Sequence, residues 1–184
     1  MNYRLAYAIG FHPWEDLAAH PPFGPALDIG TGSGIWGVQL AQRGWSVTGV
    51  DIVEKALRRA RERAARGGVE MRLVHGDVTA LHDSGVGAGF RLVVDTGTFH
   101  GLDEQGRSAM ARELDAACDD DATVLLDCFR PRRRGPLPRG ASREEVERAF
   151  RNWEVTDVEV ADTEPDPLAR ILRFDERFYR LRRA

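Results

Sequence analysis

A carboxylate precedes a glycine-rich turn in the stretch ALDIGTGSG, which spans residues 26–34. Gly30, Gly32 and Gly34 are each separated by a single residue, and Asp28 stands two positions before the first of them. Glycine adopts positive φ angles at no steric cost, and its backbone can approach a ligand without an intervening Cβ atom. The Asp28 carboxylate would repel a pyrophosphate and attract an ammonium group. We therefore expect this turn to bind a ligand whose nearest end is cationic.

Two further carboxylates follow later strand-like segments. Asp51 ends the stretch VTGVD, at about the 20-residue spacing from Gly32 at which an acidic side chain binds ribose hydroxyls. Asp77, in HGDV, can accept a hydrogen bond from the exocyclic amine of an adenine. Glycine spacing alone does not separate two ligands, since Gly32, Gly34 and Gly37 also satisfy the dinucleotide fingerprint G-x-G-x-x-G. The three carboxylates together favour S-adenosylmethionine over a nicotinamide dinucleotide.

Strand-like and helix-like segments alternate along the chain, as in a mostly parallel sheet covered by helices. Continuous apolar runs predict buried strands at residues 25–29, 46–50, 70–74, 90–95 and 123–128. Helices are predicted at 34–43, at 54–66, after a cap at Asp103, and from a Ser142–Glu145 capping box to about Phe150. Two final segments, within 153–162 and 170–183, alternate with period two and predict an antiparallel edge hairpin.

These elements predict a single Rossmann-like α/β domain: a doubly wound, mostly parallel sheet of seven strands with helices on both faces. We expect one domain over residues 1–184, made of an N-terminal lid segment (1–23), a cofactor-binding core (24–130) and a C-terminal helix with edge strands (131–184). In open α/β sheets, ligands bind beyond the carboxyl ends of the strands. The glycine turn and the three carboxylates would meet at that edge.

Four segments in this order, LDIGTGSG, VTGVDI, HGDV and FRLVVDTGTFHGL, resemble the motifs of class I S-adenosylmethionine-dependent methyltransferases over residues 24–130. The resemblance implies that the protein binds S-adenosylmethionine and transfers its methyl group. By this resemblance, the methionine portion of the cofactor would be surrounded by the residues of the glycine turn and its strand: Asp28, Gly30, Thr31, Gly32, Ser33 and Gly34. Asp95 and Thr96 would border it. Asp51 would hold the ribose, Ile52 would pack on the adenine, and Asp77 with Val78 would meet the adenine amino group.

The stretch DTGTFHGL, after the fourth predicted strand, would lie over the reactive end of the cofactor. His100 could be the general base for a hydroxyl or amine acceptor, or a loop histidine bonded to backbone; a thiolate acceptor would need no base. Phe99 is either a substrate contact or part of the core. Trp14 could face the sulfonium through a cation–π contact or anchor the N-terminal segment. Arg130 begins an arginine-rich loop, 130–139, that could orient an anionic substrate or face solvent.

The stretches HPWE and DTGTFHGL also resemble parts of the thiopurine and thiol or halide methyltransferases, which favours sulfur as the acceptor atom. We therefore predict methyl transfer to a small-molecule S, O or N nucleophile. Only 23 residues precede the glycine-turn strand and no large insertion follows, which favours a small substrate. Two alternatives stay open: an RNA methyltransferase that uses the loop 130–139, and a cofactor-binding module without turnover.

Composition limits the partners. The net charge of −3 over 184 residues gives no global attraction to nucleic acid or to an anionic membrane. No apolar stretch reaches the roughly 18 residues of a membrane helix. Cys118 and Cys128 lack metal-ligand spacing and are expected to be buried, reduced thiols, and we predict no metal site. We expect a cytoplasmic monomer or homodimer whose partner is a small-molecule methyl acceptor, with nucleic acid disfavoured.

Overall fold

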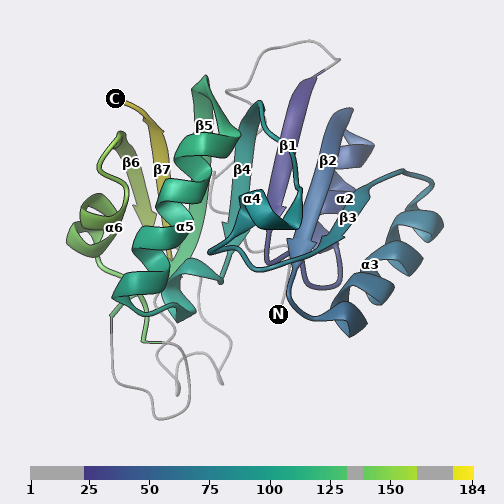
Figure 1. The fold of residues 1–184 in the computed structure, drawn as a ribbon, viewed down its shortest axis with the longest axis horizontal. Coiled ribbons are helices and arrows are strands. Elements are labelled where there is room, and N and C mark those ends of the chain that lie inside the picture. The colour runs from purple at the N-terminus through teal and green to yellow at the C-terminus, as the bar shows by residue number, and fades with distance from the viewer. Residues whose placement is uncertain (1–22, 132–138, 161–175) are drawn as a thin grey trace.

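A computed structural model describes residues 23–131, 139–160 and 176–184. Its centre is a seven-stranded sheet with the strand order β3-β2-β1-β4-β5-β7-β6 (Figure 1). The parallel strands are β1 (Phe23–Ile29), β2 (Trp45–Asp51), β3 (Arg72–His75), β4 (Phe90–Thr96) and β5 (Cys118–Phe129). β7 (Glu176–Arg183) pairs antiparallel with both β5 and β6 (Trp153–Val160). The predicted Rossmann-like sheet with its antiparallel edge is confirmed.

Helices cover both faces of this sheet. The helices in front of it in Figure 1 are α4 (Leu81–Ser84) and α5 (Glu104–Ala117), and α6 (Arg143–Ala149) packs against α5. α2 (Ile35–Gln42) lies on the opposite face, where Leu40 packs with Val47 and Leu92. α3 (Glu54–Gly67) packs against α2, β2 and β3. Strands covered on both faces carry the continuous apolar runs seen in the sequence.

The helix ends follow from residue types that the sequence displays. The Asp103 side chain accepts a hydrogen bond from Gly106 N at 2.8 Å and caps α5. Ser142 and Glu145 form the predicted capping box of α6. α3 ends at Gly67, one residue beyond the predicted end, and its C-cap is the left-handed Gly68 with a φ of 66°. These local interactions fix the lengths of the helices that carry the site.

Some elements differ from the prediction. β5 begins at Cys118, five residues earlier than expected. The acidic residues 119–121 suggest a loop in the sequence, but they form an exposed extension of this strand. The short α4 and the 3-10 helix η1 (Phe99–Gly101) have too few residues for a periodic pattern. Cys128 is buried as expected, whereas Cys118 is only half-buried. The N-terminal lid segment with Trp14, and residues 132–138 of the arginine-rich loop, lie outside the described residues.

The strand order reverses at β1, whose neighbours are β2 and β4. Crevices form at such a switch point, because the connections that leave the two adjacent strands run to opposite faces of the sheet. The glycine turn follows β1 and η1 follows β4, so the fold places both beside this crevice.

Candidate active site

The turn after β1 uses the G-x-G-x-G register. Gly30, Gly32 and Gly34 have φ angles of 58°, 55° and 73°, whereas Gly37 lies within α2. A Cβ atom on Gly30 would lie 2.0 Å from Thr98 Oγ1, so the turn packs closely on the segment after β4. A Cβ atom on Gly32 would meet only Gly30 O, at 3.8 Å. Gly32 therefore gives the turn an open face that a ligand can approach.

Asp28 lies beneath this turn and is 1% exposed. Its Oδ2 accepts hydrogen bonds from Thr31 Oγ1 at 2.6 Å and from Gly37 N at 3.0 Å. Its Oδ1 is buried and has no hydrogen-bond partner among the described residues. Burial raises the pKa of Asp28 to about 7, against the lowering effect of the Thr31 and Gly37 bonds. The free oxygen is therefore an acceptor that awaits either a proton or a cationic ligand group.

Asp51 connects the end of β2 to the glycine turn. Its Oδ2 accepts a hydrogen bond from Gly32 N at 2.8 Å, and its Oδ1 accepts one from Val53 N at 2.8 Å. The next residue, Ile52, is a large apolar side chain that is 63% exposed. An acidic side chain followed by an exposed apolar side chain suits a ribose and the flat face of a base. The structure thus brings these two predicted residues together beside the turn.

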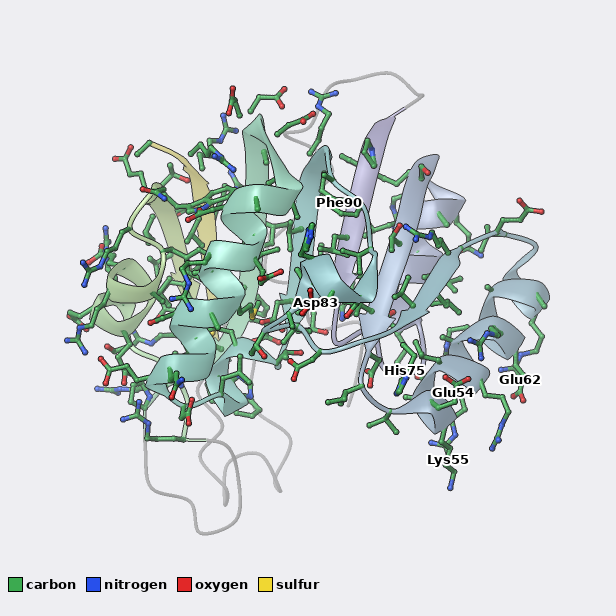
Figure 2. The ribbon with its side chains drawn as sticks, viewed as in Figure 1. Glu54, Lys55, Glu62, His75, Asp83 and Phe90 are labelled. Carbon is green, nitrogen blue, oxygen red and sulfur yellow. The ribbon has the colours of Figure 1, made fainter. Side chains whose placement is uncertain are left out.

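His75, at the end of β3, supports the same corner. Its Nε2 lies 2.9 Å from Ile52 O, and Figure 2 shows it beside Glu54 at the start of α3. The following Asp77 is exposed and accepts hydrogen bonds at Oδ1 from the Thr79 amide and hydroxyl. These bonds lower the pKa of Asp77, so this carboxylate is ionised at neutral pH. Because β1, β2 and β3 are adjacent, the three predicted carboxylates lie at the ends of neighbouring strands.

Val78 and Thr96 have different surroundings. The Val78 side chain is 7% exposed and belongs to the core, so only its backbone could meet an adenine. Thr96, the last residue of β4, is exposed at the carboxyl edge of the sheet.

Asp95 organises the segment after β4. The fully buried carboxylate accepts hydrogen bonds from three amides: Gly97 N at 3.0 Å, Thr98 N at 2.7 Å and Phe99 N at 2.7 Å. Burial raises the pKa of Asp95 to about 6, and the three amides oppose that rise. Asp95 therefore holds the backbone that leads into η1. Through that backbone, rather than by direct contact, it would border the methionine portion as predicted.

His100 is held on the inner side of η1. The residue is 4% exposed, and its ring stacks on Phe129, with the ring centroids 4.5 Å apart. Phe129 N donates a hydrogen bond to His100 Nδ1 at 3.3 Å. Gly97 lies beside the other edge of the ring, since a Cβ there would be 3.7 Å from His100 Nε2.

Phe99 and Arg130 differ in exposure. Phe99 is fully buried, 5.5 Å from Phe150 between ring centroids, and this placement fits the core alternative rather than a substrate contact. Arg130 is exposed just beyond β5. His100 and Arg130 thus follow β4 and β5, on the side of the crevice opposite Asp51 and Asp77.

Two supporting residues carry no sequence signal: Arg63 donates through Nε to Ser33 O at 2.8 Å, and Arg107 bonds to the backbone of η1. Thr98, from the predicted DTGTFHGL stretch, packs on Gly30. Arg63 reaches the glycine turn from α3, across 30 positions of sequence. Such contacts depend on how helices pack, so only the type of each residue was visible in the sequence.

The site's residues fit S-adenosylmethionine. The Asp28 oxygen without a partner suits the ammonium group of this ligand. The open face at Gly32 lets the ligand lie close to the turn, and the exposed Ile52 side chain suits the adenine ring. Within the described part of the chain, no group of three His, Cys, Asp or Glu residues could hold a metal ion. No helix among residues 23–131, 139–160 and 176–184 is long and apolar enough to cross a membrane.

Comparison with known proteins agrees with this geometry. A family model described as "Methyltransferase domain" matches residues 26–121, just over half of the chain. The ribosomal RNA small subunit methyltransferase C of Alcanivorax borkumensis is 40% identical over 55 residues, a match that covers 30% of this chain and only 17% of that relative.

Solved structures share the fold. A protein described by the conversion of a disulfide bond into a thioacetal group during echinomycin biosynthesis has a TM-score of 0.75 and 23% identity, over 96% of this chain and 81% of that chain. An S-adenosylmethionine-dependent methyltransferase from Clostridium acetobutylicum has a TM-score of 0.74 and 12% identity, over 100% and 93% of the two chains. The chain therefore belongs to the methyltransferase-domain family, and it shares the fold of S-adenosylmethionine-dependent methyltransferases.

Proposed function

We propose that the protein methylates a small-molecule nucleophile and that a thiol is the favoured acceptor. The hydrogen bond from Phe129 N to His100 Nδ1 carries this proposal. An accepting Nδ1 must keep its lone pair, so the proton of the neutral imidazole is on Nε2. In this tautomer, the only basic nitrogen of His100 is already engaged by the Phe129 amide. That arrangement argues against the general-base role suggested by the sequence and favours an acceptor that needs no base.

A thiol meets this requirement. A free thiol has a pKa of about 8.5, so a useful fraction is thiolate near neutral pH, whereas an alcohol must lose its proton during the reaction. S-adenosylmethionine, when bound, supplies a methyl group activated by a sulfonium leaving group. The thiolate would accept this methyl group directly, and the electrons of the old carbon–sulfur bond would pass to the leaving sulfur. The protein's task is then alignment of the acceptor and exclusion of water.

The cofactor would be held by the residues that surround the glycine turn. We assign the ammonium end to Asp28 Oδ1, the ribose to Asp51 and one face of the adenine to Ile52. Asp77 and the Val78 amide would meet the adenine amino group and ring nitrogen. Support comes from the free Asp28 oxygen and from the exposure of Ile52.

Two likenesses support sulfur as the acceptor atom. The structural relative from echinomycin biosynthesis is described by a reaction at sulfur atoms. The stretch DTGTFHGL, which forms the end of β4 and η1, resembles that of thiopurine and thiol or halide methyltransferases.

The test compares two thiols of different acidity, thiophenol and 2-mercaptoethanol, with a phenol, an amine and iodide. We expect thiol methylation, with the rising limb of the pH–rate profile following the pKa of each thiol. Product mass and formation of S-adenosylhomocysteine give the rate. If the rising limb has the same midpoint pH for both thiols and is lost in His100→Asn, His100 is the base and the proposal is refuted.

RNA is the second candidate acceptor, because the 55-residue match is to a ribosomal RNA methyltransferase. The arginine-rich loop supplies the charge, although of its arginines only Arg130 and Arg139 are described and Arg139 is paired with Glu145. If RNA is the substrate, binding of a ribosomal RNA fragment should weaken steeply with salt and should fall in a triple Arg132→Ala, Arg133→Ala, Arg134→Ala variant. Salt-independent or absent RNA binding would leave the small-molecule proposal in place.

A further inference from the structure

Arg107, on α5, is a charged side chain that is almost completely buried, with 3% of the side chain exposed. Its Nε donates to Phe99 O at 3.1 Å, and its Nη2 donates to His100 O at 3.1 Å and to Gly140 O at 2.6 Å. The guanidinium also lies 5.1 Å from the centroid of the Phe99 ring. One side chain thus binds the backbone of two segments, and the second of them, at Gly140, lies 33 positions after Arg107.

These two segments follow the ends of β4 and β5. η1 carries His100, and Gly140 ends the connection that leaves β5. The link closes into a circuit, because Phe129 N donates to His100 Nδ1 and Ala141 N donates to Phe129 O at 2.9 Å. Arg107 closes the circuit by bonding His100 O on one side and Gly140 O on the other. The His100 ring and the backbone on both sides of the β5 connection are therefore fixed relative to one another.

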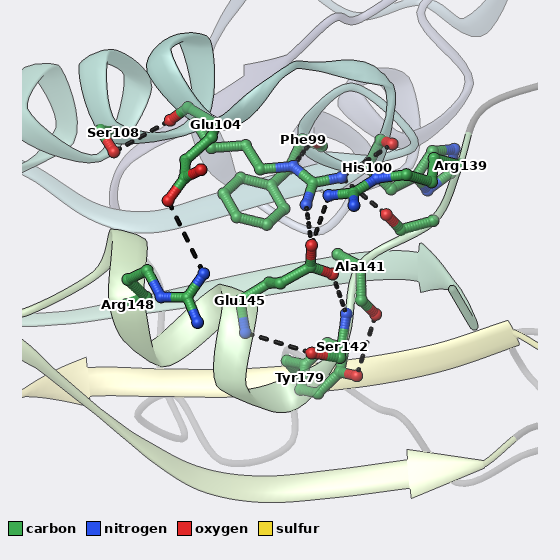
Figure 3. A network of polar contacts seen from close by, with 12 residues as sticks. Phe99, His100, Glu104, Ser108, Arg139, Ala141, Ser142, Glu145, Arg148 and Tyr179 are labelled. Atoms are coloured by element: carbon green, nitrogen blue, oxygen red, sulfur yellow. Dashed lines mark hydrogen bonds and ion pairs between the residues drawn. The ribbon is translucent and has the colours of Figure 1, made fainter. Parts of the chain in front are cut away.

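Glu145 balances the buried charge. Its Oε1 lies 3.4 Å from Arg107 Nη1 and also pairs with Arg139, while its Oε2 accepts a hydrogen bond from Ser142 N at 2.9 Å (Figure 3). Burial lowers the pKa of Arg107, and the Glu145 carboxylate opposes that effect. A buried guanidinium costs folding free energy unless it is paired and hydrogen-bonded. Its position beneath η1, with each of its three nitrogens close to a carbonyl or carboxylate oxygen, needs an explanation beyond packing.

Gly140 shows how tightly the second segment is held. It has a φ of 88°, and a Cβ atom there would lie 2.4 Å from Phe129 O and 2.6 Å from Arg130 O. The chain therefore folds back on the end of β5 at this point, and Arg107, on α5, binds the Gly140 carbonyl at this turn.

We propose that Arg107 is a positioning residue for methyl transfer: it locks η1 to the 139–141 segment, so that the His100 ring keeps its orientation and tautomer on the acceptor side of the crevice. This inference rests on the proposed function, in which the protein aligns the acceptor rather than deprotonates it. A lysine cannot replace the residue, because one ammonium group does not offer the planar fork that reaches carbonyls in two directions.

The experiment compares Arg107→Lys with Arg112→Lys, which changes an exposed arginine on the same helix. We expect Arg107→Lys to lower kcat for thiophenol by about 10- to 100-fold, as misplacement of reacting groups does. The dissociation constant for S-adenosylhomocysteine, measured by calorimetry, should change by less than about twofold, because the adenosyl-binding strands are not touched. Arg112→Lys should match the unmodified protein in both measurements.

Histidine ¹⁵N NMR gives a readout that stability alone would not move. The unmodified protein should show the His100 ring as a single Nε2–H tautomer, and Arg107→Lys should show tautomer exchange in a chain that is still folded. This readout needs no acceptor, so failure of the thiol proposal, seen as an inactive unmodified protein, stays distinguishable from failure of the positioning role.

A second variant protects against a simple loss of folding. Glu145→Gln keeps a side-chain carbonyl for the Ser142 amide and removes only the charge that faces Arg107. We expect the same pattern with a smaller effect. Equal losses of cofactor affinity and kcat, or an unchanged His100 tautomer in both variants, would overturn the proposal.

Discussion

Asp51 Oδ2 accepts a hydrogen bond from Gly32 N at 2.8 Å, across 19 positions of sequence. The carboxylate assigned to the ribose is therefore also a brace for the turn that faces the methionine portion. Each oxygen of a carboxylate has two acceptor sites, so a ribose hydroxyl can share this oxygen with the amide. One residue thereby links two parts of the cofactor site before any ligand arrives.

Replacement of Asp51 should weaken cofactor binding more than loss of one contact would. We expect Asp51→Ala to raise the dissociation constant of S-adenosylhomocysteine by at least about 10- to 100-fold, because bonds to a charged acceptor are worth about 1.5–3 kcal/mol. Calorimetry measures the change. Glu62→Ala, at an exposed position of α3, is the control and should bind normally. Normal affinity in Asp51→Ala would remove Asp51 from the site.

Cofactor affinity should depend on pH through Asp28. Its pKa is raised to about 7, and only the ionised form attracts an ammonium group. Affinity for S-adenosylhomocysteine should therefore rise with pH up to about 7 and then level off, and binding below that pH should release a proton. Calorimetry in buffers of different ionisation enthalpy counts the proton. Asp28→Asn should abolish the proton release, and a release that persists would assign it to another group.

The raised pKa of Asp28 also affects the free energy of unfolding, which should fall with rising pH where cofactor affinity rises. Between its ordinary pKa of 3.8 and its folded value of about 7, the folded state binds more protons at Asp28 than the unfolded state does. Asp95, with a pKa of about 6, acts in the same direction. The free energy of unfolding without cofactor should therefore fall as pH rises from about 4 to 7. Denaturant titrations of Asp28→Asn should show a shallower fall, and an equal slope would contradict the buried, proton-binding state.

Three glycine substitutions separate strain, collision and ligand contact. Gly68→Ala adds a methyl group in open space at a φ of 66°, so it should cost only the strain of about 1 kcal/mol. Gly30→Ala should destabilise more, because its Cβ would lie 2.0 Å from Thr98 Oγ1. Gly32→Ala should resemble Gly68→Ala in thermal unfolding and yet lose cofactor affinity. Normal affinity in Gly32→Ala would show that the ligand does not approach the open face of the turn.

Ile52 should contribute to binding without contributing to stability. Its side chain is 63% exposed, so Ile52→Ser should leave the melting temperature nearly unchanged. Loss of apolar cover on the adenine should weaken S-adenosylhomocysteine binding by about 1 kcal/mol, or roughly fivefold. Val53→Ser, at a neighbouring position that is 52% exposed, is the control. Equal effects of the two changes would mean that neither side chain touches the base.

The fold could be predicted because its information is local. Continuous apolar runs mark the buried strands, and caps such as Asp103 and the Ser142–Glu145 box mark helix starts. The position of β7 between β5 and β6 was not contained in these patterns. Alternating polarity identifies an antiparallel strand, but the choice of its neighbours depends on packing of whole faces.

The site divides in the same way. Asp28, Asp51 and the glycine turn stand at fixed spacings after strands, so the sequence reveals them. Arg107 carries no such mark, since its partners are backbone carbonyls from distant segments and backbone chemistry is the same at every residue. The tautomer of His100 was equally invisible, because it is set by one amide of β5.

The strand order has a consequence for how the chain is made. β6 is synthesised before β7, yet β7 is its hydrogen-bonding partner and also the partner that covers the edge of β5. Until residues 176–183 leave the ribosome, one edge of β5 has no strand paired to it, and β6 has no hydrogen-bonding partner strand. Nascent chains at this stage expose open strand borders, which are prone to sticking to one another. The sheet is thus completed late in translation. Interruption of synthesis before residue 176 would leave both β5 and β6 without their shared partner.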